Sequence, residues 1–239
     1  MKITLNLEKT SSKDISIMVD AFRASTSIII AVDKFKQVIP AFTPEEAKEI
    51  AENTRGILAG ERGGVKIDGF DLGNSPVDIK DFNTPSNTLV LTTSNGTRIL
   101  EDMNSTVLIG CFINAKAVAE ASLKMAKENN FSHIDVVMAG WKGNLTIEDY
   151  LASGEILYWI FKKLDEESSG EYNFKMDEFA KSAILASRDG EKVKTDIKNS
   201  ESAKRLKKLG YGRDIEFSLQ KNISNNVAIY EKGVLKVVK

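Results

Sequence analysis

Short apolar runs rich in β-branched residues alternate with amphipathic stretches along this chain, and this alternation constrains the fold more than any other feature. The runs have strand length and show no clean alternation of apolar and polar residues, which is typical of strands buried on both faces. Strands that alternate with helices indicate an α/β fold with a largely parallel sheet. The predicted strands are Ile15–Asp20, Gln37–Phe42, Ile57–Gly60, Thr88–Thr93, Thr106–Gly110 and Ile134–Gly140.

The stretches between these runs carry helix start and stop signals. Thr43-Pro44-Glu45-Glu46 is a capping box with proline at the first helical position. A later helix over 201–209 is closed by Gly210. The other predicted elements are a helix over 115–128 capped by Asn114, a helix over 147–164 that starts at Thr146, a helix over 177–187, and a small C-terminal β-hairpin over 227–238.

Size, charge and cysteine content narrow the class of protein. The 239 residues carry 33 Lys and Arg against 34 Asp and Glu, which argues against a basic nucleic-acid binder. The length suits one domain over residues 1–239, with the polar segment 165–175 as a candidate internal boundary. Cys111 is the only cysteine, and no apolar run is long enough to span a membrane. We therefore expect a soluble, cytoplasmic protein that binds neither nucleic acid nor membrane, with a homodimer as a candidate assembly.

Several catalytic classes are disfavoured by what the sequence lacks. His133 is the only histidine, so zinc sites with several His and Cys ligands cannot be built, and we expect it to be a surface-loop residue. The chain has neither a P-loop motif nor a G-x-S-x-G elbow. No second Asp follows Asp20 two positions later, and no arginine follows Cys111 six positions later. Aspartyl-phosphate and cysteine phosphatases are therefore disfavoured.

Polar residues follow several of the predicted strands at the point where each strand ends. In open α/β sheets, ligands bind at the carboxyl ends of the strands. If these strands are parallel, the loops after them converge on one crevice. The loops are residues 20–26, 60–64, 92–98, 110–114 and 139–143.

Two of these loops have the chemistry of an anion site. Ser94-Asn95-Gly96-Thr97 offers hydroxyls, a glycine and amides at a helix start, and Arg98 can add a bidentate contact to phosphate or sulfonate. Asp20 can ligate Mg²⁺ or activate water, while Arg23 can hold an anionic oxygen. The plainer alternatives are a turn at 94–97, and a helix cap with a local ion pair at Asp20 and Arg23.

The remaining polar groups at strand ends also allow more than one interpretation. Glu61-Arg62 repeats the pairing of a carboxylate with an arginine after a second strand. Asn74 lies in a turn-rich segment, where it could fix the loop or bind a ligand. Asp149 is expected to be the cap partner of Thr146, which leaves Glu148 freer to act. Carboxylates, hydroxyls and arginines together suit Mg²⁺-assisted chemistry on a small, highly anionic substrate.

The stretch 192–213 holds eight basic and two acidic residues. Such a stretch is either a solvated helix face or a site for an acidic ligand.

Taken in order along the chain, five segments resemble those of the 2-phosphosulfolactate phosphatase family. Each segment alone is weakly specific, whereas five in the same order over most of the chain are specific. The segments are Val19-Asp20-Ala21-Phe22-Arg23-Ala24-Ser25-Thr26, Gly60-Glu61-Arg62-Gly63-Gly64, Gly69-Phe70-Asp71-Leu72-Gly73-Asn74-Ser75-Pro76, Thr92-Thr93-Ser94-Asn95-Gly96-Thr97 and Glu148-Asp149-Tyr150-Leu151-Ala152-Ser153-Gly154.

The resemblance implies a three-layer α/β/α fold with a largely parallel or mixed sheet. It also implies Mg²⁺-dependent hydrolysis of 2-phospho-3-sulfolactate to 3-sulfolactate and phosphate, a step in coenzyme M formation. The expected catalytic residues are Asp20, Arg23 and Glu61, and the expected Mg²⁺ ligands are Asp20, Glu61 and Glu148. The expected substrate-binding residues are Arg62, Asn74, Ser75, Ser94, Asn95, Gly96, Thr97 and Arg98.

This chain departs from the family pattern at Trp141-Lys142, where small residues are expected, and at Ser153, where alanine is common. Either departure could alter substrate choice. Two other functions stay open at this point. One is a phosphatase for another small phosphorylated hydroxy acid. The other is a non-catalytic anion-binding module, which would need the 94–98 cradle but no cluster of carboxylates.

Overall fold

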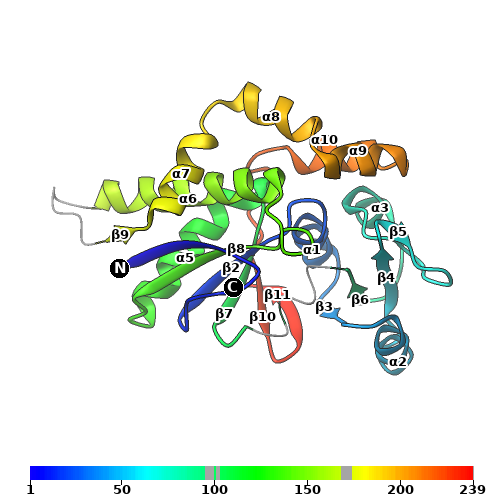
Figure 1. Cartoon of the computed structure of the whole chain (residues 1–239). Helices are drawn as coiled ribbons and strands as arrows, with labels where there is room; N and C mark the ends of the chain where they lie inside the picture. Colours follow the sequence, from blue (N-terminus) through cyan, green and yellow to red (C-terminus); the bar gives the residue numbers. More distant parts are fainter. Residues whose placement is uncertain (95–99, 101–102, 168–173, 239) are drawn as a thin grey trace.

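The structure of the chain, a computed structural model, describes residues 1–94, 100, 103–167 and 174–238 (Figure 1). Within these residues the strands form one mixed sheet in the order β5-β4-β6-β3-β11-β10-β7-β2-β8-β1-β9. The strands are β1 (Lys2–Leu7), β2 (Ile15–Val19), β3 (Gln37–Pro40), β4 (Ile57–Arg62), β5 (Val65–Lys66), β6 (Thr88–Thr92), β7 (Thr106–Gly110), β8 (His133–Met138), β9 (Lys175–Met176), β10 (Ala228–Glu231) and β11 (Val234–Val237).

Two sets of parallel strands make up most of this sheet. The first set is β7, β2, β8 and β1, and the second is β3, β6 and β4. The C-terminal hairpin β10–β11 lies between the sets and pairs antiparallel to β7 on one side and to β3 on the other. Because three antiparallel steps separate β7 from β3, the two sets run in opposite directions. The sheet is therefore mixed, and the carboxyl ends of the two sets do not share one edge.

Helices cover both faces of the sheet, which confirms the predicted three-layer α/β fold. Within the described residues they are α1 (Ala24–Lys34), α2 (Pro44–Thr54), α3 (Pro76–Asp81), the 3₁₀ turn η1 (Phe112–Asn114), α5 (Ala115–Glu128), α6 (Ile147–Glu167), α7 (Glu178–Ala186), α8 (Gly190–Lys198), α9 (Glu201–Lys208) and α10 (Gly212–Ser218).

Successive residues of β2 assign the layers, because they point to opposite faces of the sheet. Ile17 and Val19 belong to the hydrophobic cluster that includes residues of α5, α6 and α7. Met18, between them, belongs to the cluster that includes residues of α1 and α3. On the second set, Val90 packs with α2. The outer layers are thus α1 with α3 on one face, and α2 with α5, α6 and α7 on the other.

Most of the predicted elements are present within a few residues of their expected bounds. Thr43 Oγ1 accepts the amide hydrogen of Glu46 at the start of α2, which confirms the predicted cap. Asn114 does not cap α5; its side chain instead bonds the backbone of Cys111, Ile109 and Asn226. His133 is not a loop residue: it begins β8, where its Nε2 lies 2.8 Å from Thr4 Oγ1. No helix in the described part of the chain is apolar over the length needed to cross a bilayer.

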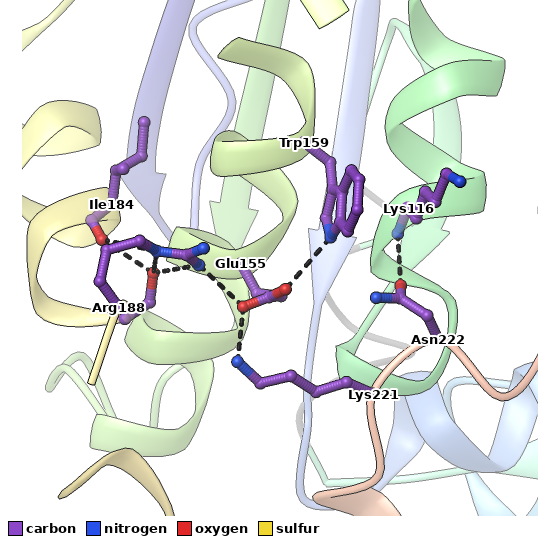
Figure 2. A network of polar contacts seen from close by, with 8 residues as sticks. Lys116, Glu155, Trp159, Ile184, Arg188, Lys221 and Asn222 are labelled. Atoms are coloured by element: carbon purple, nitrogen blue, oxygen red, sulfur yellow. Dashed lines mark hydrogen bonds and ion pairs between the residues drawn. The ribbon is translucent and has the colours of Figure 1, made fainter. Parts of the chain in front are cut away.

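Helices α8, α9 and α10 form a roof that runs from α7 to α3 in Figure 1. Ser75, at the start of α3, donates to Asp214 Oδ1 of α10 at 2.6 Å and so closes one side of this roof. Glu155 of α6 fastens the other side (Figure 2). Its carboxylate accepts from Arg188 after α7 at 2.8 Å and from Lys221 after α10 at 2.7 Å. The roof is thus held at both ends by buried carboxylates.

Candidate active site

Three carboxylates gather where β2 and β8 end and α6 begins. Asp20 follows β2, while Glu148 and Asp149 lie in the first turn of α6. Asp149, predicted as the cap partner of Thr146, accepts the amide hydrogens of Ala21 at 2.8 Å and Gly140 at 3.0 Å, and so ties the ends of the two strands together. The loops after β2 and β8 therefore converge, as the sequence predicted for parallel neighbours.

The pKa of Asp20 is raised to about 7 by burial and by the negative charges of Glu61 and Glu148, against the opposing effect of the Ala24 amide. Its side chain is buried, and Oδ1 accepts that amide hydrogen at 3.3 Å. Burial raises the pKa of Glu148 as well, although the Ser202 and Ser200 hydroxyls oppose the shift. Burial together with Asp20 and Glu148 raises the pKa of Asp149 well above its ordinary value. The site therefore groups carboxyl groups whose charged forms a bound cation would stabilise.

Glu61 joins this site from the second set of strands. Its Oε2 accepts the amide hydrogen of Gly64 at 2.6 Å, and its Oε1 accepts that of Ser94 at 2.7 Å. These bonds fix the turn between β4 and β5 and hold it beside the end of β6. Ser94, predicted to bind substrate, thus contacts Glu61 directly.

Arg23 links the two sets of strands. Its Nη2 donates to Gly64 O at 2.9 Å and its Nη1 donates to Asp214 Oδ2 of the roof at 3.1 Å. The guanidinium carbon lies 4.3 Å from the centre of the Tyr211 ring. Arg23 is therefore placed in the site as predicted, but much of its hydrogen-bonding capacity is used to join β2, the β4–β5 turn and α10.

The convergence of Asp20 and Glu61 has a physical cause that the parallel-sheet prediction missed. Six steps across the sheet separate β4 from β2, and these strands run in opposite directions. Strand-to-strand twist of about 20–25° accumulates to about 130° over that distance. This rotation turns the carboxyl end of β4 toward that of β2.

The other predicted site residues differ in whether their polar atoms are already hydrogen-bonded within the protein. Arg62 donates through Nη1 to Glu61 O at 2.7 Å and through Nη2 to Thr92 Oγ1 at 2.9 Å, so it braces the end of β4. Ser75 caps α3 and holds Asp214, which makes it a structural anchor. Asn74 lines the site, and its Oδ1 is buried without a hydrogen-bond partner among the described residues.

Four predicted substrate-binding residues, Asn95, Gly96, Thr97 and Arg98, lie outside the described residues.

The site also contains residues that the sequence analysis did not assign to it. Trp141, after β8, and Arg205, in α9, line the same cavity as Asp20 and Glu61. Trp141 had been noted only as a departure in its loop. For Arg205 the available signal was the basic stretch 192–213, for which an acidic ligand was one of the two interpretations. The cavity has a volume of about 40 Å³ in this structure.

The donor atoms fit a magnesium ion. Asp20 supplies a carboxylate, and both Glu148 Oε2 and Asn74 Oδ1 are buried oxygens without a hydrogen-bond partner in the described residues. Among those residues, no three His, Cys, Asp or Glu side chains are grouped closely enough to enclose an ion by themselves. Mg²⁺ does not need such a cage, because it keeps several waters and takes one or two carboxylates together with substrate phosphate.

Two other features are less suited to phosphate chemistry. Burial raises the pKa of the Cys111 thiol to about 12, so this cysteine stays protonated and is a poor nucleophile. A larger groove beside α6 and α7 is lined mainly by apolar side chains such as Phe161, Ile184 and Leu185, with no carboxylate among its lining residues. The cavity at Asp20 is therefore the candidate active site.

Comparisons with known proteins agree with this assignment. The family model for 2-phosphosulpholactate phosphatase matches residues 2–233. The chain is 41% identical over 238 residues to the 2-phosphosulfolactate phosphatase of Methanothermobacter thermautotrophicus, covering 100% of this chain and 96% of that protein. It is 34% identical over 235 residues to the protein of the same name from Methanocaldococcus jannaschii, covering 95% and 93%. It is also 34% identical over 234 residues to a probable 2-phosphosulfolactate phosphatase of Clostridium tetani, covering 96% and 94%. With a match over nearly its whole length and oxygen donors gathered in one cavity, this chain belongs to the 2-phosphosulfolactate phosphatase family.

Proposed function

We propose that this protein is a phosphoric monoester hydrolase that converts 2-phospho-3-sulfolactate and water to 3-sulfolactate and phosphate. The observation that carries the proposal is the cavity that brings Asp20 together with Glu61, Arg23 and Arg205, while Glu148 and Asp149 are buried near Asp20. A non-catalytic anion binder has no use for such a group of carboxylates, because buried like charges oppose anion binding.

Asp20 and Asn74 would hold a Mg²⁺ ion, with Glu61 as a further predicted ligand. Glu148, expected from the family resemblance to be a ligand, is assigned to proton transfer instead. The ion would neutralise charge on the phosphoryl oxygens. Arg23 orients the substrate, while the roof limits access of bulk water.

We assign Glu148 as the group that takes a proton from the attacking water, because its Oε2 has no partner among described residues and its pKa is raised. The water oxygen then bonds to phosphorus as the ester P–O bond breaks, and the proton taken by Glu148 passes to the departing alkoxide, which leaves as the hydroxyl group of 3-sulfolactate. Cytoplasmic action and a role in coenzyme M formation stay expectations from the family resemblance.

The test is phosphate release from 2-phospho-3-sulfolactate in the presence of Mg²⁺ and, separately, of EDTA. Asp20→Asn should lower kcat by about 100-fold or more, since it removes a charge at the reacting phosphoryl group. The matched control is Asp81→Asn, which makes the same change on a side chain 66% exposed. Its rate should equal that of the unaltered protein.

The outcomes separate the alternatives. Turnover of 2-phospholactate or 3-phosphoglycerate without turnover of the sulfonate would keep the phosphatase chemistry and change the substrate. Absence of turnover with all three, while 3-sulfolactate still binds, would contradict the proposal in favour of an anion-binding module.

A further inference from the structure

Arg205 lies in the active-site cavity, and no hydrogen bond joins its guanidinium to another of the described residues. Its Nε is buried without a hydrogen-bond partner among the described residues. Its charge opposes the rise in the pKa of Glu148, yet no described carboxylate forms an ion pair with it. Arg23 and Arg62, by contrast, donate to protein groups through both terminal nitrogens. A guanidinium left with free donors in a cavity is suited to an anion that arrives with the substrate.

A rigid aromatic platform holds Arg205 in place. The guanidinium carbon lies 4.1 Å from the centre of the Trp141 ring, within the range of a cation–π contact. Trp141 sits in a tight turn in which its amide and carbonyl both bond Asn144, at 2.8 and 3.0 Å. Gly140, just before it, has φ of +61°, and a Cβ there would meet Asn144 O at 2.5 Å. The platform is therefore fixed before substrate binds, which lowers the entropy lost on binding.

The chemistry of this pair distinguishes among the anionic groups of the substrate. A phosphate dianion is strongly hydrated and is matched by a metal ion and by amides. A sulfonate is a monoanion with spread charge, and it can accept two parallel hydrogen bonds. A guanidinium group is weakly hydrated, can donate two parallel hydrogen bonds to two oxygens, and can stack on the face of an aromatic ring. Arg205 on Trp141 therefore matches the sulfonate better than it matches the phosphoryl group.

We propose that Arg205, held on the Trp141 ring, binds the sulfonate of the substrate and sets the preference for a sulfonated over a plain phosphorylated hydroxy acid. This inference rests on the proposed function, and it assigns a task to one residue of the basic stretch 192–213. The Trp141-Lys142 departure noted in the sequence then takes part in selecting the substrate.

The test compares two substrates that differ only in the sulfonate. Arg205→Met should lower kcat/KM for 2-phospho-3-sulfolactate by about 100-fold, the value of losing a charge-assisted bidentate contact, and change it by less than about threefold for 2-phospholactate. Arg205→Lys keeps the charge but loses the planar pair of donors. Its kcat/KM for 2-phospho-3-sulfolactate should therefore lie between those of the unaltered protein and Arg205→Met. Trp141→Leu should lower the ratio of kcat/KM for 2-phospho-3-sulfolactate to that for 2-phospholactate by about fivefold. An equal loss on both substrates would overturn the proposal, because it would place Arg205 on the shared phosphoryl or carboxylate group.

Arg213→Met is the matched control, because it removes the same charge from a side chain 80% exposed on the adjacent helix α10. It should leave both rates unchanged. A second readout separates this inference from the proposed function. Calorimetric binding of 3-sulfolactate should weaken at least about tenfold in Arg205→Met and stay the same in Arg213→Met, even if the unaltered protein releases no phosphate. Equal affinity in both variants would contradict the sulfonate assignment.

Discussion

Asp20 is a carboxyl group that the fold keeps in its neutral form over an unusually wide pH range. Its pKa of about 7 exceeds the ordinary value of 3.8 because the folded protein buries it near other carboxylates. The folded state therefore binds its proton more tightly than the unfolded state does. Protonated Asp20 makes its full contribution to the free energy of unfolding below about pH 4. That contribution is lost as the pH rises through 7.

We expect the free energy of unfolding in EDTA to fall by about 2 kcal/mol between about pH 5.5 and about pH 8 because of this one group. Asp20→Asn should lack this part of the decline, since asparagine carries no charge at either pH. Urea denaturation of both proteins at the two pH values measures the difference. Parallel declines in the two proteins would show that Asp20 has an ordinary pKa.

At the scale of single residues, the sequence predicted groups that follow strand ends and missed those that arrive from elsewhere. Asp20 and Glu61 were predicted as site residues because each stands at the carboxyl end of an apolar run, where ligand-binding residues of α/β sheets lie. Trp141 was considered only as a departure that could alter substrate choice, and Arg205 lies in a helix far along the chain. Their pairing is a contact through space, which spacing along one sequence does not encode.

Among the elements, the roof of α8, α9 and α10 brings Arg205 and Asp214 over the site and depends on Glu155 (Figure 2). Glu155 is 4% exposed, and its carboxylate takes hydrogens from Arg188, Lys221 and the Trp159 indole. Neutralising it leaves two cations beside a polar but uncharged group.

Glu155→Gln should lower the free energy of unfolding by about 1–3 kcal/mol, as expected when hydrogen bonds to a buried charge are weakened. Glu166→Gln is the control on the same helix, because Glu166 is 54% exposed and forms a surface pair with Lys162. That change should cost less than about 0.5 kcal/mol. Equal, small losses in the two variants would show that Glu155 does not secure the roof.

Helix α1 illustrates which elements local patterns fail to predict. It contains Ile28-Ile29-Ile30, a β-branched run that favours a strand, and almost all of the helix is buried. Packing against α3 and the sheet decides its conformation, as happens for helices that are apolar on most sides. Helices that begin with a capping residue were easier to predict from the sequence. Thr43 with Glu46 correctly marked the start of α2.

Across the whole molecule, the hairpin β10–β11 joins two sets of strands that otherwise have no partner for their inner edges. The sequence predicted this hairpin, but as a small addition at the end of the chain. Its position at the centre depends on pairings with β3 and β7, which are far away in the sequence. Local turn and strand signals carry no information on such pairings.

We expect the two sets to unfold together because of this hairpin. Leu235 is fully buried and pairs with Val38, so Leu235→Ala should cost about 2–5 kcal/mol. Hydrogen exchange should then speed up by a similar factor for amides of β6 in one set and β2 in the other. Lys236→Ala, on the exposed face, is the control. Faster exchange in β6 alone would show that the sets unfold independently.

The central hairpin also sets the order in which the sheet can be built during protein synthesis. The ribosome completes β3 and β7 long before it makes residues 228–237, which must lie between them. Until those residues emerge, the nascent chain holds two unfinished sheets, each with an open edge that can pair with other chains. Vectorial folding from the N-terminus therefore cannot complete this fold, and the decisive step of assembly is the insertion of its last two strands.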